Sequence, residues 1–130
     1  MLKRTKRFLL MLLAFPFVCV GCSTGGPLSY EQINGAEAKA LMDSESGYII
    51  IDARTQSEYD EGHIPGAIMI PEYEIADRAE KELHDKSQLI LVYCRSGRRS
   101  KIAAEELVKL GYTNVKEFGG IIEWEYEIVK

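Results

Sequence analysis

The chain has 130 residues, with 16 basic and 20 acidic side chains and a formal net charge of −4. Residues 1–21 hold four of the basic residues and no acid, so the remaining 109 residues carry a formal charge of about −8. Such a surface repels phosphate groups and argues against nucleic acid and anionic lipid head groups as partners. A chain of this length fits one domain with a single core.

The first 21 residues have the pattern of an export signal. Lys and Arg residues precede an apolar run from Phe8 to Val20, and at 13 residues this run is shorter than the roughly 20 needed to span a membrane. Pro16 inside the run argues against a stable buried helix. We therefore expect residues 1–21 to be a signal peptide.

The segment CVGC, Cys19–Cys22, resembles the lipobox of bacterial lipoproteins. The resemblance implies that Cys22 is lipidated and becomes the N-terminus. Residues 23–29, STGGPLS, have the composition of a linker, so we expect residues 22–29 to tether a domain at residues 30–130. It also implies a protein lipid-anchored to a membrane of the bacterial cell envelope, facing outside the cytoplasm. Cys19 stands where the lipobox usually has leucine, and an ordinary cleaved signal or an uncleaved anchor are the alternatives.

The elements that follow alternate between helix and strand patterns. Asn34 and Glu37 have capping-box spacing and begin a helix, as do Thr55 and Glu58. Between them, the apolar run at residues 48–52 predicts a buried strand.

The second half of the domain repeats this alternation. Residues 66–71 predict a short buried strand, residues 72–84 an amphipathic helix, and residues 88–93 the best strand in the chain. A helix follows to Gly111, which suits its C-terminal cap, and residues 114–118 predict a last strand. The alternation predicts a parallel sheet covered on both faces.

Cys94 follows the best predicted strand and precedes a helix. Arg95, Arg98 and Arg99 lie within five residues of it. Unpaired N–H groups at the helix start, a bend at Gly97 and the three arginines create a positive site for an anion. Such surroundings lower the pKa of a thiol, which favours the nucleophilic thiolate.

Four motifs in order resemble a single-domain rhodanese: Asp-x-Arg-x-x-x-Glu-Tyr from Asp52, GHIPGA, the cysteine loop CRSGRRS, and FGGIIEW. The resemblance implies an α/β three-layer sandwich, with a parallel sheet of about five short strands and helices on both faces. It also implies a sulfurtransferase in which Cys94 takes sulfur from thiosulfate or a related donor as a persulfide and passes it to a thiophilic acceptor. Arg95, Ser96, Gly97, Arg98, Arg99 and Ser100 would bind the donor, with no metal or organic cofactor.

The resemblance also bears on residues outside the loop. Asp52 and Arg54 are expected to form an internal ion pair that supports the site, and Glu58 to cap its own helix. His63 is expected to pack and form hydrogen bonds rather than act as a base, and Trp124 to lie in the core. The alternation of residues 122–128 is a strand pattern, but the family has a helix after its Gly-Gly, so a C-terminal helix is predicted.

Other functions remain open for the loop. A cysteine phosphatase or arsenate reductase would need an arginine six positions after Cys94, where this chain has Ser100. A binding or sensing module would capture an anion or oxidised sulfur without turnover. A redox thiol would lack a resolving cysteine, since lipidation of Cys22 leaves Cys94 alone.

Overall fold

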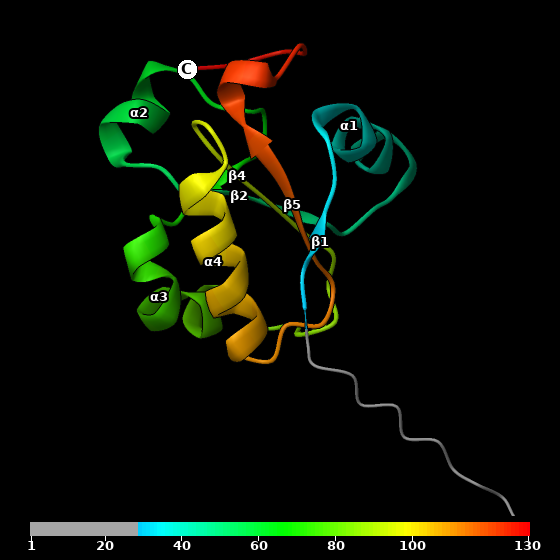
Figure 1. Cartoon of the computed structure of the whole chain (residues 1–130), viewed down its shortest axis with the longest axis vertical. Coiled ribbons are helices and arrows are strands. Elements are labelled where there is room, and N and C mark those ends of the chain that lie inside the picture. The colour runs from blue at the N-terminus through cyan, green and yellow to red at the C-terminus, as the bar shows by residue number, and fades with distance from the viewer. Residues whose placement is uncertain (1–28) are drawn as a thin grey trace, which may run out of the picture.

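The computed structural model describes residues 29–130, so the predicted signal, Cys22 and nearly all of the linker lie outside the described residues. One sheet of five parallel strands has the order β1-β5-β4-β2-β3 (Figure 1). Its strands are β1 (Glu31–Gln32), β2 (Ile49–Asp52), β3 (Ile68–Met69), β4 (Ile90–Cys94) and β5 (Val115–Gly120). The predicted parallel α/β architecture is confirmed.

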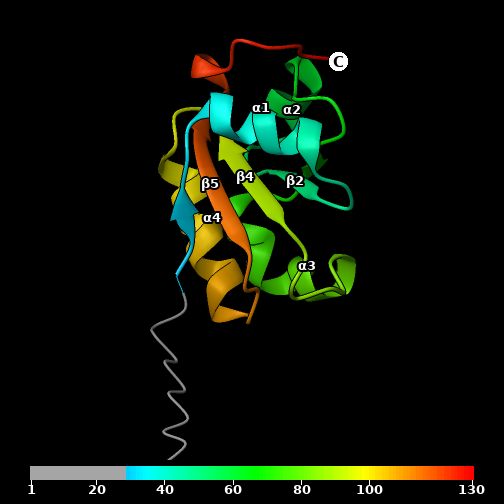
Figure 2. The ribbon, with the colours of Figure 1, turned by 90° about the vertical axis from the view of Figure 1, so that its right-hand side faces the viewer.

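Helices cover both faces of the sheet. Helix α1 (Gly35–Ser44) lies on one face, and α3 (Ile75–Glu82) and α4 (Arg98–Lys109) lie on the other (Figures 1 and 2). The short helix α2 (Gln56–Glu61) lies near the carboxyl ends of the strands. The sheet and the helices on its two faces therefore form three layers. Two short 3₁₀ helices, η1 (Glu72–Glu74) and η2 (Ile121–Glu123), are also present.

The core consists of two apolar clusters, one on each face. Successive residues of β4 enter opposite clusters, because side chains alternate along a strand: Val92 packs with α3 and α4, whereas Leu91 and Tyr93 pack with Phe118 and Trp124. Trp124 is 9% exposed, which confirms its predicted place in the core. No helix among residues 29–130 has the length and hydropathy to cross a membrane.

Both predicted capping boxes are present. Asn34 Oδ1 accepts the backbone N–H of Glu37, whose carboxylate accepts the Asn34 N–H, both at 2.8 Å. Thr55 and Glu58 make the same exchange at the start of α2. Each box satisfies N–H groups that the first helical turn leaves without a partner.

The predicted C-terminal helix is wrong. Residues 121–123 form one 3₁₀ turn, and the segment then runs irregularly until Val129 pairs with His63 in an antiparallel bridge. This path is fixed by the indole of Trp124, which is buried and donates its N–H to the Glu127 carbonyl at 3.1 Å.

Two strands also differ from expectation. The predicted buried strand at residues 66–71 is a two-residue edge strand in which Ile68 is 36% exposed. Strand β1 was not predicted, because two residues are too few for a periodic pattern and it forms only by pairing with β5.

Candidate active site

The candidate site lies at the carboxyl edge of the sheet, where β2, β4 and β5 end in Asp52, Cys94 and Gly120. Ligands of open parallel sheets bind at this edge. Cys94 is 1% exposed, and the next residues, Arg95 and Ser96, turn outward to solvent before α4 begins. The thiol is therefore a buried group at the base of an exposed loop.

The loop folds back so that its backbone contacts the sulfur. Gly97 has φ +105°, a conformation that favours glycine, and its N–H donates to Cys94 Sγ at 3.0 Å. Burial raises the pKa of the Cys94 thiol, but hydrogen bonds with the Ser100 hydroxyl and with loop N–H groups outweigh that effect, so the pKa lies below its ordinary value. The loop therefore favours the thiolate.

The Gly-Gly motif at the end of β5, Gly119–Gly120, packs against the backbone of this loop. A Cβ on Gly120 would lie 1.9 Å from the Arg95 carbonyl oxygen, so only glycine fits there. The same carbonyl accepts the N–H of Ile122 at 3.3 Å. The motif thus allows the loop backbone to pack directly on the strand end.

Ser100 is buried next to the Cys94 thiol and is not exposed to solvent. Its side chain is fully buried, and Oγ lies 3.4 Å from Cys94 Sγ and 2.6 Å from Glu117 Oε1. Glu117, on β5, is 3% exposed. Sequence reasoning missed this residue, although an acid within a predicted apolar strand was a signal that could have marked it.

The three arginines of the loop have different surroundings. Arg99 forms a two-point ion pair with Glu58 of α2, with both N–O distances 2.8 Å, while Arg95 and Arg98 are exposed. The hydrogen bonds from Arg99 hold the pKa of Glu58 well below its usual range. Glu58 caps its own helix as predicted, but its pairing with Arg99 was not foreseen, because nothing in the sequence places α2 beside α4.

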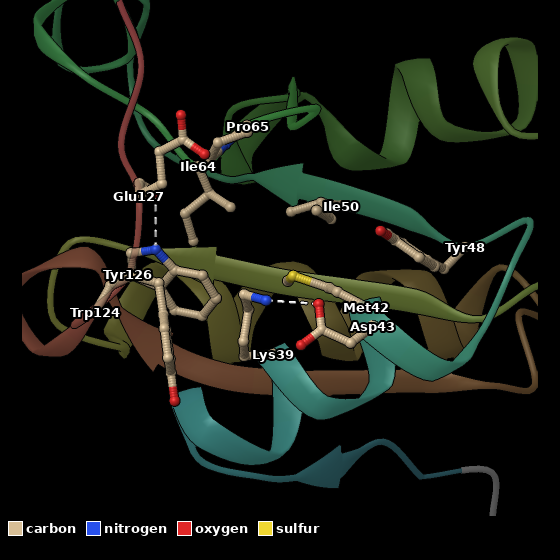
Figure 3. Close-up of a pocket in the computed structure, with 10 residues that line it drawn as sticks. All are labelled: Lys39, Met42, Asp43, Tyr48, Ile50, Ile64, Pro65, Trp124, Tyr126 and Glu127. Carbon is tan, nitrogen blue, oxygen red and sulfur yellow. Dashed lines mark hydrogen bonds and ion pairs between the residues drawn. The ribbon is translucent and has the colours of Figure 1, made fainter.

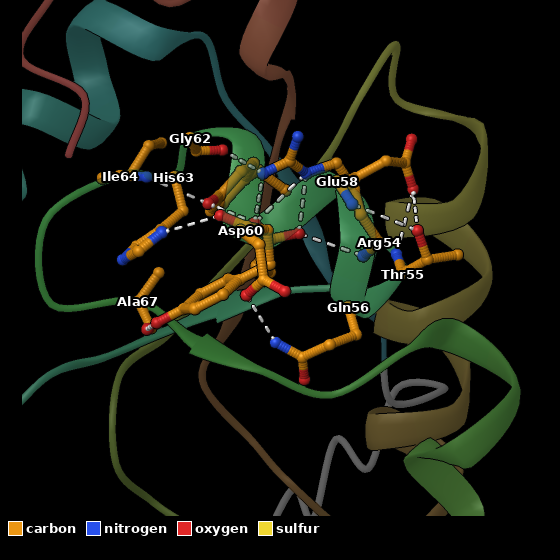
Figure 4. Close-up of polar contacts among 12 residues, drawn as sticks. Arg54, Thr55, Gln56, Glu58, Asp60, Gly62, His63, Ile64 and Ala67 are labelled. Carbon is orange, nitrogen blue, oxygen red and sulfur yellow. Dashed lines mark hydrogen bonds and ion pairs between the residues drawn. The ribbon is translucent and has the colours of Figure 1, made fainter. Parts of the chain in front are cut away.

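Asp52 and Arg54 form the expected internal ion pair, at 2.7 Å between Oδ2 and Nη2. Tyr93 donates its hydroxyl hydrogen to the same carboxylate at 2.6 Å, and Arg54 donates to the carbonyl of Gly62 (Figure 4). The pair is 0% and 5% exposed at its two residues, so it braces the backbone next to the site from inside the protein.

His63 takes part in packing. Its ring stacks on Tyr59 with centroids 3.7 Å apart, and Nδ1 lies 2.9 Å from the Tyr59 carbonyl oxygen (Figure 4). The packing and hydrogen-bonding place expected from the sequence is confirmed.

Residues 34–127, which include every part of this site, match the family model described as the Rhodanese-like domain. The chain belongs to the rhodanese family. Its relatives include sulfurtransferases, and its fold is that of solved rhodanese structures.

Three relatives illustrate the match. Thiosulfate sulfurtransferase PspE of Escherichia coli is 41% identical over 71 residues, which cover 55% of this chain and 68% of that protein. Thiosulfate sulfurtransferase GlpE of Coxiella burnetii is 33% identical over 99 residues, 75% of this chain and 90% of that protein. A solved structure described as a rhodanese with anions from E. coli is 37% identical, with a TM-score of 0.61 over 64% of this chain and 98% of that one.

Two of the hollows in residues 29–130 differ in their relation to this site. One, of about 270 Å³, adjoins the Arg99–Glu58 pair and is lined by Arg54, Glu58, Glu61, Gly62, Ile121, Ile122 and Ile128. The other, of about 180 Å³, lies on the α1 face between that helix and the C-terminal segment (Figure 3). It includes Lys39, Met42 and Trp124 but no residue of the cysteine loop. Within residues 29–130, no three His, Cys, Asp or Glu side chains gather as a metal site would require.

Proposed function

We propose that this protein is a sulfurtransferase that moves a sulfane sulfur from thiosulfate, or a related anionic donor, to a thiophilic acceptor through a persulfide on Cys94. The observation that carries the proposal is the Cys94 sulfur itself, which ends a buried strand and accepts the Gly97 N–H at 3.0 Å. An N–H group that donates to a sulfur favours its thiolate form, and this sulfur lies at the base of an exposed loop.

The first step is a displacement at sulfur. The Cys94 thiolate attacks the outer sulfur of thiosulfate, a new S–S bond forms to Sγ, and the S–S bond of the donor breaks. The electron pair of that bond leaves with sulfite, so charge is conserved. This is covalent catalysis by an activated cysteine.

The second step returns the enzyme to its resting state. A nucleophilic acceptor such as cyanide attacks the outer sulfur of the persulfide, the bond to Sγ breaks, and the Cys94 thiolate is released. Because the donor leaves before the acceptor reacts, the kinetics are ping-pong. Neither step requires a base to act on the substrate.

Charge near the loop attracts the donor. Arg95 and Arg98 are exposed in the loop that follows Cys94, and a dianionic donor approaching them meets a positive potential on an otherwise acidic protein. Arg99 contributes less, because Glu58 compensates its charge. In this proposal, N–H groups of the loop also hold the outer sulfur of the persulfide.

The test is intact-mass spectrometry of the purified full chain after incubation with thiosulfate, with Cys94→Ser as the matched control. We expect a gain of one sulfur atom that cyanide reverses and that the variant lacks. The absence of any gain in the wild type would reject the thiosulfate reaction and favour a module that binds anions without turnover.

We also propose that Cys22 carries a lipid that holds the protein on a membrane of the bacterial cell envelope, outside the cytoplasm. The support is the basic and apolar pattern of residues 3–20 together with the overlapping segment CVGC at residues 19–22. Cys22→Ala should remain unprocessed and carry no lipid in mass spectrometry. A Cys22→Ala protein that is still cleaved and lipidated would refute the anchor.

A further inference from the structure

Behind the Cys94 thiol lies a buried carboxylate that the two proposed steps do not use. Glu117 Oε1 accepts the Ser100 hydroxyl hydrogen at 2.6 Å, and Ser100 Oγ accepts the Cys94 S–H at 3.4 Å. Cys94, Ser100 and Glu117 are 1%, 0% and 3% exposed, so the chain of hydrogen bonds runs inside the protein. A thiol and a carboxylate are thus joined through a single hydroxyl.

The hydroxyl of Ser100 has one hydrogen and several acceptors. Glu117 Oε1 is the nearest, at 2.6 Å, compared with 3.0 Å to the Gly97 carbonyl oxygen. While this hydrogen points at Glu117, Ser100 offers the sulfur only a lone pair, which suits a protonated thiol. A thiolate needs the opposite arrangement, with the hydroxyl hydrogen turned towards Sγ.

Glu117 is held in place by the backbone rather than by a cation. The Gly119 N–H donates to Oε1 at 2.8 Å, and within residues 29–130 no Lys, Arg or His forms an ion pair with this carboxylate. The elements packed around this side of β5 carry the following charged or titratable groups: Tyr30 and Glu31 at β1, Cys94 on β4, Arg95 in the cysteine loop, Arg98, Arg99, Lys101, Glu105, Glu106 and Lys109 on α4, and Glu123 in η2. Of these, only Cys94 is joined to Glu117 by hydrogen bonds, through Ser100.

We infer that Glu117 takes up the proton of Cys94 through Ser100, so that the buried pair can hold its one proton on either the sulfur or the carboxylate. In this transfer the S–H bond of Cys94 breaks as an O–H bond forms on Ser100. The former O–H bond of Ser100 breaks as an O–H bond forms on Glu117. The charge of the pair is unchanged, and Ser100 now donates to the thiolate.

This inference rests on the proposed function, in which the thiolate attacks the donor, and it makes Glu117 a positioning residue for that step. A pair that shares one proton keeps part of its sulfur as thiolate over a range of pH. It loses the last proton only at higher pH, so the pair titrates in two steps. A thiol without such a partner titrates once.

The test follows the rate at which iodoacetamide alkylates Cys94 in the full chain, as a function of pH and on the peptide that contains Cys94. We expect the wild-type rate to rise in two steps with a plateau between them. Glu117→Gln should rise in a single step, its rate falling about tenfold per pH unit below the midpoint. Glu123→Gln is the control, because Glu123 is exposed and its substitution removes the same charge close to the loop. Its alkylation rate should still rise in two steps.

Ser100→Ala removes the hydroxyl that joins Cys94 to Glu117. Its alkylation rate should also rise with pH in a single step, and thermal unfolding checks that the variant is folded. A merely structural brace would alter stability without changing the number of steps. A single step in the wild type, or a Glu117→Gln profile that superimposes on it, would overturn the inference.

Alkylation uses no sulfur donor, so the two proposals fail separately. One step in the wild type together with normal persulfide formation refutes the proton link alone. Two steps without any persulfide refute the proposed sulfur transfer and leave the proton link supported.

Discussion

Arg99 and Glu58, 41 residues apart in the chain, form a two-point ion pair with both N–O distances at 2.8 Å. The pair joins the start of α4, where the cysteine loop ends, to α2. Planar, two-point pairing is the strongest geometry available to an arginine and a carboxylate. An anionic donor that binds Arg99 must therefore compete with Glu58.

Removing this competitor should improve donor binding. Glu58→Gln is expected to lower the thiosulfate KM several-fold, because Arg99 is then free to bind the dianion, while kcat changes little. Steady-state kinetics at constant ionic strength measure both constants. Glu61→Gln removes a charge from the same helix and hollow without touching Arg99, and it should leave KM near the wild-type value. An unchanged or higher KM in Glu58→Gln would argue against competition.

The same pair should make stability depend on pH in the acid range. Because Arg99 lowers the folded-state pKa of Glu58, the contribution of this carboxylate is fully present above its unfolded pKa of about 4.3. It is lost progressively as pH falls below that value. Urea unfolding should show a difference between wild type and Glu58→Gln that is constant from about pH 5 to 7 and shrinks at pH 3. Arg99→Ala should show the same trend, and a difference that does not shrink would contradict the pairing.

The strand end under the loop should not tolerate a side chain. Gly120→Ala is expected to destabilise the protein by about 2–3 kcal/mol or more, because its Cβ would overlap the Arg95 carbonyl and force the backbone apart. Sulfur transfer should fall at least as strongly. Gly47→Ala is the control: its φ of +70° strains alanine but nothing lies within 4 Å, so it should cost only about 1 kcal/mol. Equal effects would remove the close-packing argument.

The buried pair beside the site should be costly to break from one side. Asp52→Asn leaves the Arg54 guanidinium buried without a counter-charge, and we expect a loss of about 3–5 kcal/mol in the free energy of unfolding. Asp43→Asn breaks an exposed pair with Lys39 and should cost about 0–1 kcal/mol. Chemical denaturation measures both, and similar losses would show that the Asp52 pair does not brace the fold.

Local signals in the sequence predicted most of the fold. The two capping boxes, the apolar run before Cys94 and the helix ending near Gly111 all depend on residues close together in the chain, and each is present. The C-terminal segment could not be predicted in this way. Its path depends on the place of one buried indole and on a bridge to His63, and neither leaves a periodic pattern.

In the candidate site too, local features could be predicted from the sequence, whereas contacts between distant residues could not. The Gly97 bend is local, so the sequence was enough to predict the loop around Cys94. The partners of Ser100 and Arg99 come from β5 and α2, and the proximity of Glu117 and Glu58 follows from the order of the strands and the packing of helices. Tertiary contacts of this kind add acids to a site that the sequence alone describes as basic.

Because all five strands are parallel, they begin at one end of the sheet and finish at the opposite end. The chain enters β1 beside the last turn of α4, where Ser29 and Tyr30 share a hollow with Val108 and Lys109, whereas Cys94 lies next to the first turn of that helix. Twelve helical residues separate these ends by about 18 Å. With the lipid proposed at Cys22, the anchor and the thiol would belong to opposite ends of the sheet, because Ser29 precedes β1 and Cys94 ends β4.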